Sequence, residues 1–276
     1  MGATKNNVTV LGKGPRTILM AHGFGCDQNM WRFLTPAVQD DYQVVLFDYV
    51  GSGGSDPSYF DAKKYARLEG YAGDVIDVCT ALKLKDVYFI GHSVSAMIGL
   101  IASIKEPALF AKMVMVCPSP CFLNFPPTYF GGFEHADLEE LLALMDINYI
   151  GWANYLGPMV MGANAPDLIA ELSDSFCSTD PRIAKVFARA TFFSDCRDLL
   201  PKAQHPTLIL QSSTDALAAV SVGEYVHAHL PNSRLELVAA EGHCLHMTHS
   251  QQVAQLVRDF CPSAAQSYDA ASNSPL

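Results

Sequence analysis

The sequence predicts an α/β protein: a mostly parallel, twisted sheet with helices on both faces and a helical segment inserted between two strands. Three observations support this prediction. Short apolar runs alternate with amphipathic segments over 6–120 and again over 205–260, which is the pattern of βαβ units. From about 125 to 195, segments with helical periodicity follow one another without a strand. The chain has 276 residues and is 50% hydrophobic, which is enough for a sizeable core.

The first half of the chain is predicted to alternate strands with helices. The segment 6–12 alternates apolar and polar residues as a half-exposed strand does, and 16–23 is a short apolar run typical of a buried strand. In 68–84 and 96–105 the apolar residues recur at intervals near 3.6, which predicts helices. Further strands are expected at 43–56, where the strand runs into a Gly/Ser loop, at 86–93 and at 111–120.

The second half begins with the helical segment and then returns to the alternating pattern. Helices are expected at 135–156, 165–176 and 181–195, the last with Pro181 near its first turn, where proline is tolerated. Strands are then expected at 205–215 and 234–240, with helices near 220–230 and at 250–260. The predicted division is a core domain of 1–124 and 196–265, a helical lid of 125–195 and a polar tail of 266–276.

The charge of the chain argues against several classes of partner. The formal net charge is −10, from 18 basic and 28 acidic residues, and no Lys/Arg cluster larger than a pair occurs. Such a surface favours neither nucleic acid nor an anionic membrane as partner. No apolar run is long enough for a transmembrane helix, and the N-terminus lacks the pattern of a signal peptide.

The number and spacing of the cysteines indicate the cellular compartment and whether the chain is expected to bind a metal. Eight cysteines are scattered without a C-x-x-C pair, which is typical of buried thiols in a reducing compartment, so we expect a cytoplasmic protein. The best metal-like group is HCLHMTH, with His243, Cys244, His246 and His249. No matching Cys or His pair stands at zinc-finger spacing elsewhere. We therefore expect neither a metal nor an organic cofactor.

One junction between a strand and a helix carries a candidate nucleophile. In YFIGHSVSAMIGL, residues 88–100, a buried strand stops at Gly91 and a helix follows Ser93. The pattern G-x-S-x-small at such a junction is typical of a nucleophile elbow, in which a tight turn lifts the serine hydroxyl above the strand ends. The usual fifth residue is glycine, and here it is Ser95. Because short patterns also arise by chance, an ordinary turn with an incidental serine is the alternative.

Chain order supports the elbow, because this kind of fold places its acid and then its histidine after the serine. Asp215 follows the strand run TLILQSS, and His243 follows the strand predicted at 234–240. At these strand ends His243 would act as general base toward Ser93, and Asp215 would hold the imidazole in place. The alternatives are His246 and His249 for the base, and Asp195 and Asp198 for the acid.

Two further loops follow predicted strands. In AHGFG, residues 21–25, an H-G loop after the second strand offers a backbone N–H to an oxyanion, so we expect the amides of Phe24 and Val94 to be the donors. The alternative is a plain glycine turn. The loop DYVGSGGSD at 48–56 lacks the lysine and the glycine spacing of phosphate loops and is expected to pack beside the elbow. Elbow, acid, histidine and H-G loop together predict an α/β hydrolase.

With these motifs in this order, the chain resembles the RsbQ-type branch of α/β hydrolases and its plant relatives, which perceive karrikins and strigolactones. The resemblance spans nearly the whole chain and is carried by HGFGCDQNMW, VLFDYVGSGGSD, GHSVSAMIG, GGFE, NYIGWA, FFSD and EGHC. It implies the triad of Ser93, Asp215 and His243 beneath a V-shaped lid of four helices. The apolar pocket residues that it implies are Phe24, Phe122, Phe133, Trp152 and Phe192. Plain core packing is the alternative role for these aromatics.

The resemblance also implies a function. Members of this group hydrolyse small esters or butenolides slowly and act in signalling, the bacterial ones with a PAS-domain phosphatase and the plant ones with F-box proteins. We therefore expect a serine hydrolase of small apolar esters or butenolide-type lactones with a ligand-sensing, stress-regulatory role. The alternative is a binding module with slow or vestigial hydrolysis that acts through a protein partner. A haloperoxidase or a haloalkane dehalogenase is a third, weaker option, and the dehalogenase is disfavoured because the elbow residue is Ser93 rather than an aspartate.

Overall fold

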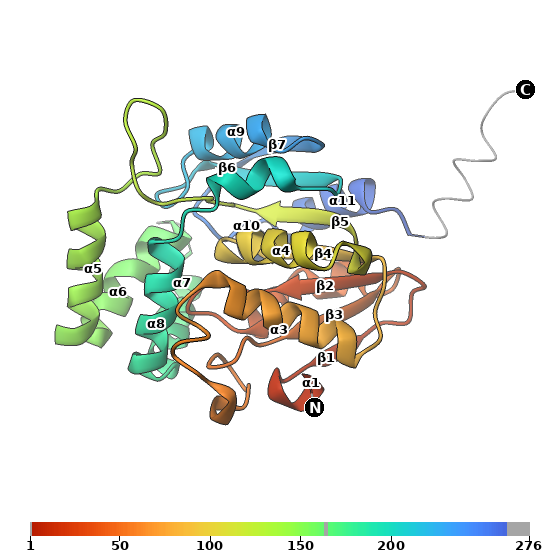
Figure 1. Cartoon of the computed structure of the whole chain (residues 1–276), viewed down its shortest axis with the longest axis horizontal. Coiled ribbons are helices and arrows are strands. Elements are labelled where there is room, and N and C mark those ends of the chain that lie inside the picture. The colour runs from red at the N-terminus through yellow and green to blue at the C-terminus, as the bar shows by residue number, and fades with distance from the viewer. Residues whose placement is uncertain (1, 163–164, 264–276) are drawn as a thin grey trace, which may run out of the picture.

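The computed structural model describes residues 2–162 and 165–263, so the tail predicted at 266–276 lies outside the described residues. The strands are β1 (Thr9–Leu11), β2 (Thr17–Ala21), β3 (Gln43–Phe47), β4 (Val87–His92), β5 (Phe110–Val116), β6 (Thr207–Thr214) and β7 (Ser233–Glu241). They form one sheet with the order β1-β3-β2-β4-β5-β6-β7 (Figure 1). β1 is antiparallel to β3, and all other neighbours are parallel. The predicted α/β class is therefore confirmed.

Helices cover both faces of the sheet. One face carries α3 (Leu68–Ala81), α4 (Val94–Lys105) and α9 (Val220–His229), and the other carries α2 (Thr35–Val38) and α11 (Ser250–Phe260). β2 shows why both faces must be covered: Leu19 packs into one core cluster, and Ile18 and Met20 pack into the other. Successive side chains of a strand point to opposite faces. The remaining short elements are α1 (Gly2–Lys5), α10 (Leu245–Thr248) and the 3₁₀ turns Gln28–Trp31, Pro57–Tyr59, Pro107–Leu109 and Arg197–Lys202.

Four helices lie between β5 and β6 in the chain and beyond the carboxyl ends of the parallel strands (Figure 1). They are α5 (His135–Ile147), α6 (Tyr149–Met161), α7 (Pro166–Ser178) and α8 (Pro181–Phe192). The segment predicted to be helical over 135–156 forms two helices, which meet at Asn148, so the helical insertion has the four helices that the resemblance implies. The Asn148 side chain accepts a hydrogen bond from Gly151 N at 2.9 Å and so begins a new helix.

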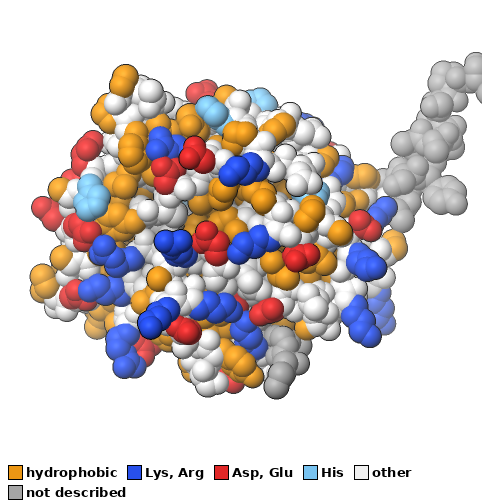
Figure 2. All heavy atoms as spheres, viewed as in Figure 1, with side chains coloured by type: hydrophobic (Ala, Val, Ile, Leu, Met, Phe, Trp, Pro, Cys, Tyr) orange, Lys and Arg blue, Asp and Glu red, His pale blue; other side chains and the backbone are white. Residues whose placement is uncertain are grey.

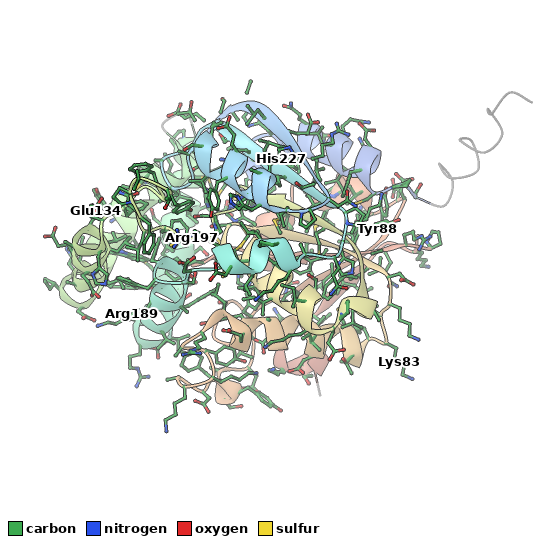
Figure 3. The ribbon with its side chains drawn as sticks, turned by 45° about the horizontal axis from the view of Figure 1, so that its top comes forward. Lys83, Tyr88, Glu134, Arg189, Arg197 and His227 are labelled. Atoms are coloured by element: carbon green, nitrogen blue, oxygen red, sulfur yellow. The ribbon has the colours of Figure 1, made fainter. Side chains whose placement is uncertain are left out.

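Surface ion pairs in the inserted segment connect two of its helices and lie where it rejoins the core. Arg189 of α8 donates to both carboxylate oxygens of Glu139 on α5, each at 3.1 Å. Arg197 lies where the helical segment rejoins the core (Figure 3), and its guanidinium pairs with the carboxylate of Asp195. Exposed pairs of this kind contribute about 0–1 kcal/mol each. The apolar packing of the helices therefore matters more for their position than these pairs do.

The surface charge and the lengths of the helices bear on the sequence-based expectation that nucleic acids and membranes are not partners. On the face shown in Figure 2, acidic and basic side chains are interspersed with hydrophobic ones. This face therefore lacks the continuous basic stripe that nucleic-acid binding favours. Within the part of the chain that the structure describes, no helix is both long enough and apolar enough to cross a membrane.

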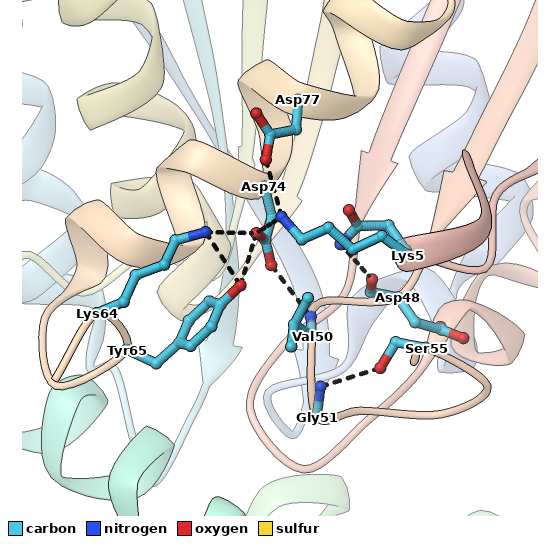
Figure 4. Close-up of polar contacts among 10 residues, drawn as sticks. Lys5, Asp48, Val50, Gly51, Ser55, Lys64, Tyr65, Asp74 and Asp77 are labelled. Atoms are coloured by element: carbon cyan, nitrogen blue, oxygen red, sulfur yellow. Dashed lines mark hydrogen bonds and ion pairs between the residues drawn. The ribbon is translucent and has the colours of Figure 1, made fainter. Parts of the chain in front are cut away.

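A buried ion pair holds the N-terminal segment against α3 and the Gly/Ser loop. Lys5 Nζ lies 2.7 Å from Asp74 Oδ1 and 2.8 Å from Asp77 Oδ2 (Figure 4). The fully buried Asp74 carboxylate also accepts the Val50 N–H at 3.1 Å and the Tyr65 hydroxyl at 2.8 Å. One carboxylate thus joins three segments that are far apart in the sequence.

We expect Lys5→Ala to lower the free energy of unfolding by about 3 kcal/mol, because it leaves the buried Asp74 charge without its nearest cation. Lys64, 3.4 Å from Asp74, remains as a weaker partner. Urea unfolding followed by circular dichroism measures the loss. The matched control is Lys85→Ala, at an exposed lysine, for which a change within about 0.5 kcal/mol is expected. Equal midpoints for the two variants would contradict the prediction.

Candidate active site

The predicted elbow forms at the carboxyl end of β4, the central strand of the sheet. β4 ends at His92 and α4 begins at Val94. Ser93 between them has φ 55° and ψ −122°, a strained conformation of the kind that clusters at functional sites. A Cβ atom at Gly91 would lie 2.5 Å from the backbone oxygen of Ser95. The turn therefore requires glycine at this position.

The predicted histidine and acid both reach this serine. His243 Nε2 lies 2.7 Å from Ser93 Oγ, and His243 Nδ1 lies 2.7 Å from Asp215 Oδ2. The side chains of His243 and Asp215 are 2% and 0% exposed, so water screens their interaction little. In this geometry the imidazole can accept the proton of the serine hydroxyl.

Asp215 follows β6 and is anchored by its own loop. Its Oδ1 accepts the N–H groups of Leu217 at 2.8 Å and Ala218 at 3.1 Å, which leaves Oδ2 for His243. Burial alone would raise the pKa of the Asp215 carboxyl, but His243 and the two N–H groups outweigh it and lower that pKa below its ordinary value. The ionised carboxylate accepts the Nδ1–H of His243 and so leaves Nε2 as the acceptor for the serine proton.

The backbone beside His243 contacts the helical segment. The His243 N–H donates to Val160 O of α6 at 2.7 Å, and the Gly242 N–H donates to Thr214 O at 2.8 Å. Gly242 has φ 98°, and a Cβ atom there would lie 2.2 Å from Met161 O. The glycine of EGHC thus lets the histidine loop pass against the end of α6, and the histidine backbone is bonded directly to that helix.

The alternative bases and acids lie elsewhere. His246 is fully buried; its ring centroid is 4.4 Å from that of Trp31, and burial lowers its pKa to about 3. His249 Nδ1 is bonded within its own turn. Asp195 is engaged in the surface pair described above, and Asp198 belongs to the 3₁₀ turn that follows. In the described residues, no hydrogen bond connects any of these four side chains to the serine.

The H-G loop lies beside the elbow. It follows β2, the parallel neighbour of β4, so both loops meet at one edge of the sheet. Val94 is the first residue of α4, and the first N–H groups of a helix have no acceptor within it. Gly25 has φ 71°, and the ring of Phe176 fills the space where a side chain would stand. The structure therefore brings the loops of both predicted N–H donors, Phe24 and Val94, to the serine.

A cavity of about 30 Å³ lies beside Ser93 and His243. Phe24, Phe122 and Phe192, all predicted as pocket residues, line it. The other two do not line this cavity: Phe133 borders a separate one of about 600 Å³. Trp152 is fully buried behind Phe24, with the ring centroids 6.0 Å apart.

Sequence reasoning missed further wall residues of the cavity. They are mostly apolar and include no Lys or Arg: Cys26, His92, Leu156, Val160, Leu172, Phe176, Thr191, Leu217 and Cys244. Leu217 had a usable signal, because it follows the predicted acid by two residues in the same loop. For the residues on the inserted helices no signal existed. An apolar position on a helix predicts burial, and burial in a core and burial beside a cavity give the same pattern.

Comparison with known proteins is in keeping with this geometry. Residues 18–256 match the alpha/beta hydrolase family. The chain belongs to this family. A karrikin insensitive 2 receptor of Petunia hybrida is 44% identical, over 86% of this chain and 88% of that protein. A strigolactone esterase of Arabidopsis thaliana is 37% identical, over 93% of this chain and 96% of its own length.

A solved structure gives the same result for the α/β hydrolase fold. A hydrolase of Oleispira antarctica is 55% identical to this chain and superimposes with a TM-score of 0.92, over 94% of this chain and 95% of that one. These similarities confirm the expected family and its plant relatives. The protein described here has the Ser–His–Asp arrangement that is typical of this fold.

One group of side chains in this α/β hydrolase has the spacing of a metal site. Among the described residues, the ligand atoms of Cys117, Asp215 and His243 lie within 4.8 Å of one another. His243 Nδ1, however, donates its proton to Asp215 and so has no free lone pair. Burial raises the pKa of the Cys117 thiol, which keeps it in its weakly coordinating form. The donor set therefore fits a hydrogen-bonded triad better than a bound ion.

Proposed function

We propose that this hydrolase cleaves small, neutral, apolar esters or butenolide-type lactones through nucleophilic attack by Ser93. The observation that carries the proposal is the pair of 2.7 Å contacts that His243 makes, one to Ser93 Oγ and one to Asp215 Oδ2. A serine hydroxyl is a weak nucleophile until a positioned base takes its proton. The apolar wall of the cavity supports a neutral substrate.

The proposed reaction has two halves. Ser93 Oγ attacks the carbonyl carbon while its proton passes to His243 Nε2, and the electron pair of the C=O bond moves to oxygen. The N–H groups of Phe24 and Val94 donate to this oxyanion. When the intermediate collapses, the C–O bond to the alcohol breaks, and the leaving oxygen takes the proton from His243. In a lactone this oxygen stays attached to the acyl group.

In the second half, water attacks the acyl carbon and gives a proton to His243. Collapse of this intermediate breaks the bond to Ser93 Oγ, which recovers its proton from the imidazole. The products are an acid and an alcohol, or one hydroxy acid from a lactone. Apart from the substrate and water, every group in these proposed steps belongs to the protein chain.

The four inserted helices form the lid in this proposal, with the core on either side of 125–195 as the sequence predicts. Leu156 and Val160 of α6 and Leu172 and Phe176 of α7 supply part of the cavity wall. The lid thus both selects the ligand and excludes water from the reacting atoms. All eight cysteines are free thiols, which supports a cytoplasmic location as part of the proposal.

A second candidate function is a ligand sensor with slow turnover that acts through a protein partner. The similarity to a karrikin insensitive 2 receptor favours it. The resemblance implies a phosphatase or an F-box protein as partner and a role in stress regulation. Turnover separates the two functions: kcat on the order of ten per second indicates a metabolic hydrolase, whereas a rate lower by several orders of magnitude indicates a sensor.

We expect a neutral lactone or ester to bind at least about tenfold more tightly than an analogue of equal size that carries a carboxylate. An ionised group loses its hydration in this wall without gaining a cationic partner. The measurement is a titration followed by tryptophan fluorescence, because Trp152 packs against Phe24 and Phe176, which line the cavity.

The titration uses the Ser93→Ala variant, so that hydrolysis does not consume the ligand. Trp152→Phe in the same background is the control for the signal, since only Trp31 then remains. Tighter binding of the anionic analogue would contradict the apolar-pocket proposal and would indicate a cationic group at the site.

A further inference from the structure

The fifth residue of the elbow, Ser95, makes contacts that the usual glycine could not make. Its side chain is fully buried in the first turn of α4. Ser95 Oγ donates to His22 O at 2.5 Å and lies 2.8 Å from the hydroxyl oxygen of Tyr49. A serine hydroxyl has one proton, and here His22 O receives it, so Tyr49 is the donor in the second contact. A chain of two hydrogen bonds therefore runs from Tyr49 through Ser95 to the H-G loop.

Tyr49, at one end of these two hydrogen bonds, keeps its phenolic proton. Burial raises the pKa of Tyr49, so the hydroxyl stays a donor throughout the neutral range. Consecutive hydrogen bonds polarise one another. The bond from Ser95 to the His22 carbonyl is thus stronger than an isolated one.

The imidazole of His22 holds the next peptide of the H-G loop. His22 Nε2 accepts the Tyr49 N–H at 3.2 Å, so the neutral ring donates from Nδ1 to Gly23 O at 2.8 Å. Burial lowers the pKa of His22, in keeping with a neutral ring. The Cys26 N–H donates to the same Gly23 oxygen at 3.3 Å. Because a peptide is planar and trans, a fixed Gly23 carbonyl also fixes the direction of the Phe24 N–H.

Ser95 stands directly after Val94, whose N–H is the other proposed oxyanion donor. We propose that Ser95 is a positioning residue, which sets the placement of the Phe24 and Val94 N–H groups relative to each other through its bond to His22 O. This inference rests on the proposed reaction at Ser93. Donors that are held in place before the oxyanion forms need no reorganisation when it does, which is the source of their catalytic effect.

A purely steric role predicts a different result. The turn is tight, since the backbone of Ser95 stands where a Cβ atom at Gly91 would be. If position 95 required only small size, glycine and alanine would serve as well as serine. The two explanations therefore differ in what Ser95→Gly, which restores the usual elbow sequence, does to the rate.

The test compares Ser95→Ala and Ser95→Gly with Ser103→Ala in the full chain, with p-nitrophenyl acetate as substrate. Ser103 is a matched control, because it is buried on the same helix and its Oγ donates to Leu100 O at 2.9 Å within that helix. We expect both Ser95 variants to lose kcat roughly tenfold with KM within about twofold. A shifted donor should cost less than a deleted one, which costs about 10²–10³-fold. Ser103→Ala should keep the wild-type kcat.

Two further measurements separate positioning from general destabilisation. A trifluoromethyl ketone, which forms a tetrahedral adduct with a serine, should bind each Ser95 variant more weakly in proportion to its loss of kcat. Tyr49→Phe should cost less than Ser95→Ala and should add nothing in the Ser95→Ala background, because the two hydroxyls act as one chain. Melting temperatures of all variants are recorded alongside.

Wild-type kcat in Ser95→Gly, or a full additional loss from Tyr49→Phe in the Ser95→Ala background, would overturn the inference. Ser93→Ala, assayed in parallel, shows which claim has failed. If Ser93→Ala is inactive while Ser95→Gly keeps its rate, the inference about Ser95 fails and the proposed function stands. If Ser93→Ala is as active as the wild type, both fail.

Discussion

Replacement of Ser93 by alanine is expected to lower kcat for ester hydrolysis by at least about 10⁴-fold while the protein stays folded. The hydroxyl is the proposed nucleophile, and what survives its loss is the catalysis that binding and the oxyanion donors provide. Alanine meets the same backbone constraint as serine at φ 55°, so the melting temperature should change little. The measurement is the initial rate with p-nitrophenyl acetate, at saturating substrate, with purified wild type and variant.

Mass spectrometry adds a second observation on the same variant. A wild-type sample quenched during turnover should carry one acetyl group on the peptide that contains Ser93, and the Ser93→Ala sample should carry none. Ser103→Ala controls for the loss of a buried hydroxyl on the adjoining helix. Acetylation of His243 or Cys244, with turnover retained in Ser93→Ala, would move the nucleophile to another residue of the cavity.

The second large effect is expected for Asp215→Asn, with a loss in kcat of about 10³–10⁴-fold. The two Oδ1 contacts to backbone N–H groups keep the oxygen of the new amide at that site, so its NH₂ group faces His243. The imidazole must then accept at Nδ1 and carry its proton at Nε2, where it cannot take the serine proton. The loss should appear in kcat, with substrate binding almost unchanged.

Asp195→Asn and Asp198→Asn are the matched comparisons for this variant, since sequence reasoning alone left both as alternative acids. Each should keep a rate within about twofold of the wild type, in line with substitutions at exposed surface positions. A wild-type rate in Asp215→Asn together with a large loss in Asp195→Asn would place the acid at the end of the helical segment.

The parts of the fold that could be predicted are those that local pattern determines. Residues 18–21 and 87–91 are apolar without interruption because β2 and β4 are covered on both faces, so these strands stood out. The break at Asn148 could not be found from periodicity. The apolar repeat continues across it, and what separates the two helices is the non-helical backbone of Asn148 (φ −153°, ψ 82°), whose side chain caps the second helix.

The candidate site likewise contains residues that local sequence pattern could predict and contacts that only the tertiary fold determines. Ser93, Asp215 and His243 could be proposed because each follows a strand, and parallel strands end at one edge of a sheet. The role of Ser95 could not be inferred, because its partners Tyr49 and His22 lie 46 and 73 positions away in the chain. A departure from a motif shows in the sequence, whereas the contacts that make use of it are set by the tertiary fold.

The size of the cavity at Ser93 has a consequence for how any ligand binds. About 30 Å³ holds one or two water molecules, whereas pockets for small ligands measure about 300–1,000 Å³. A ligand of the proposed class would therefore bind only conformers in which the walls have moved apart, and its apparent affinity would be the intrinsic affinity multiplied by the population of those conformers. If one molecule in a hundred is open, the apparent Kd rises about a hundredfold. Substitutions far from the ligand that favour the open form would then tighten binding without adding a contact.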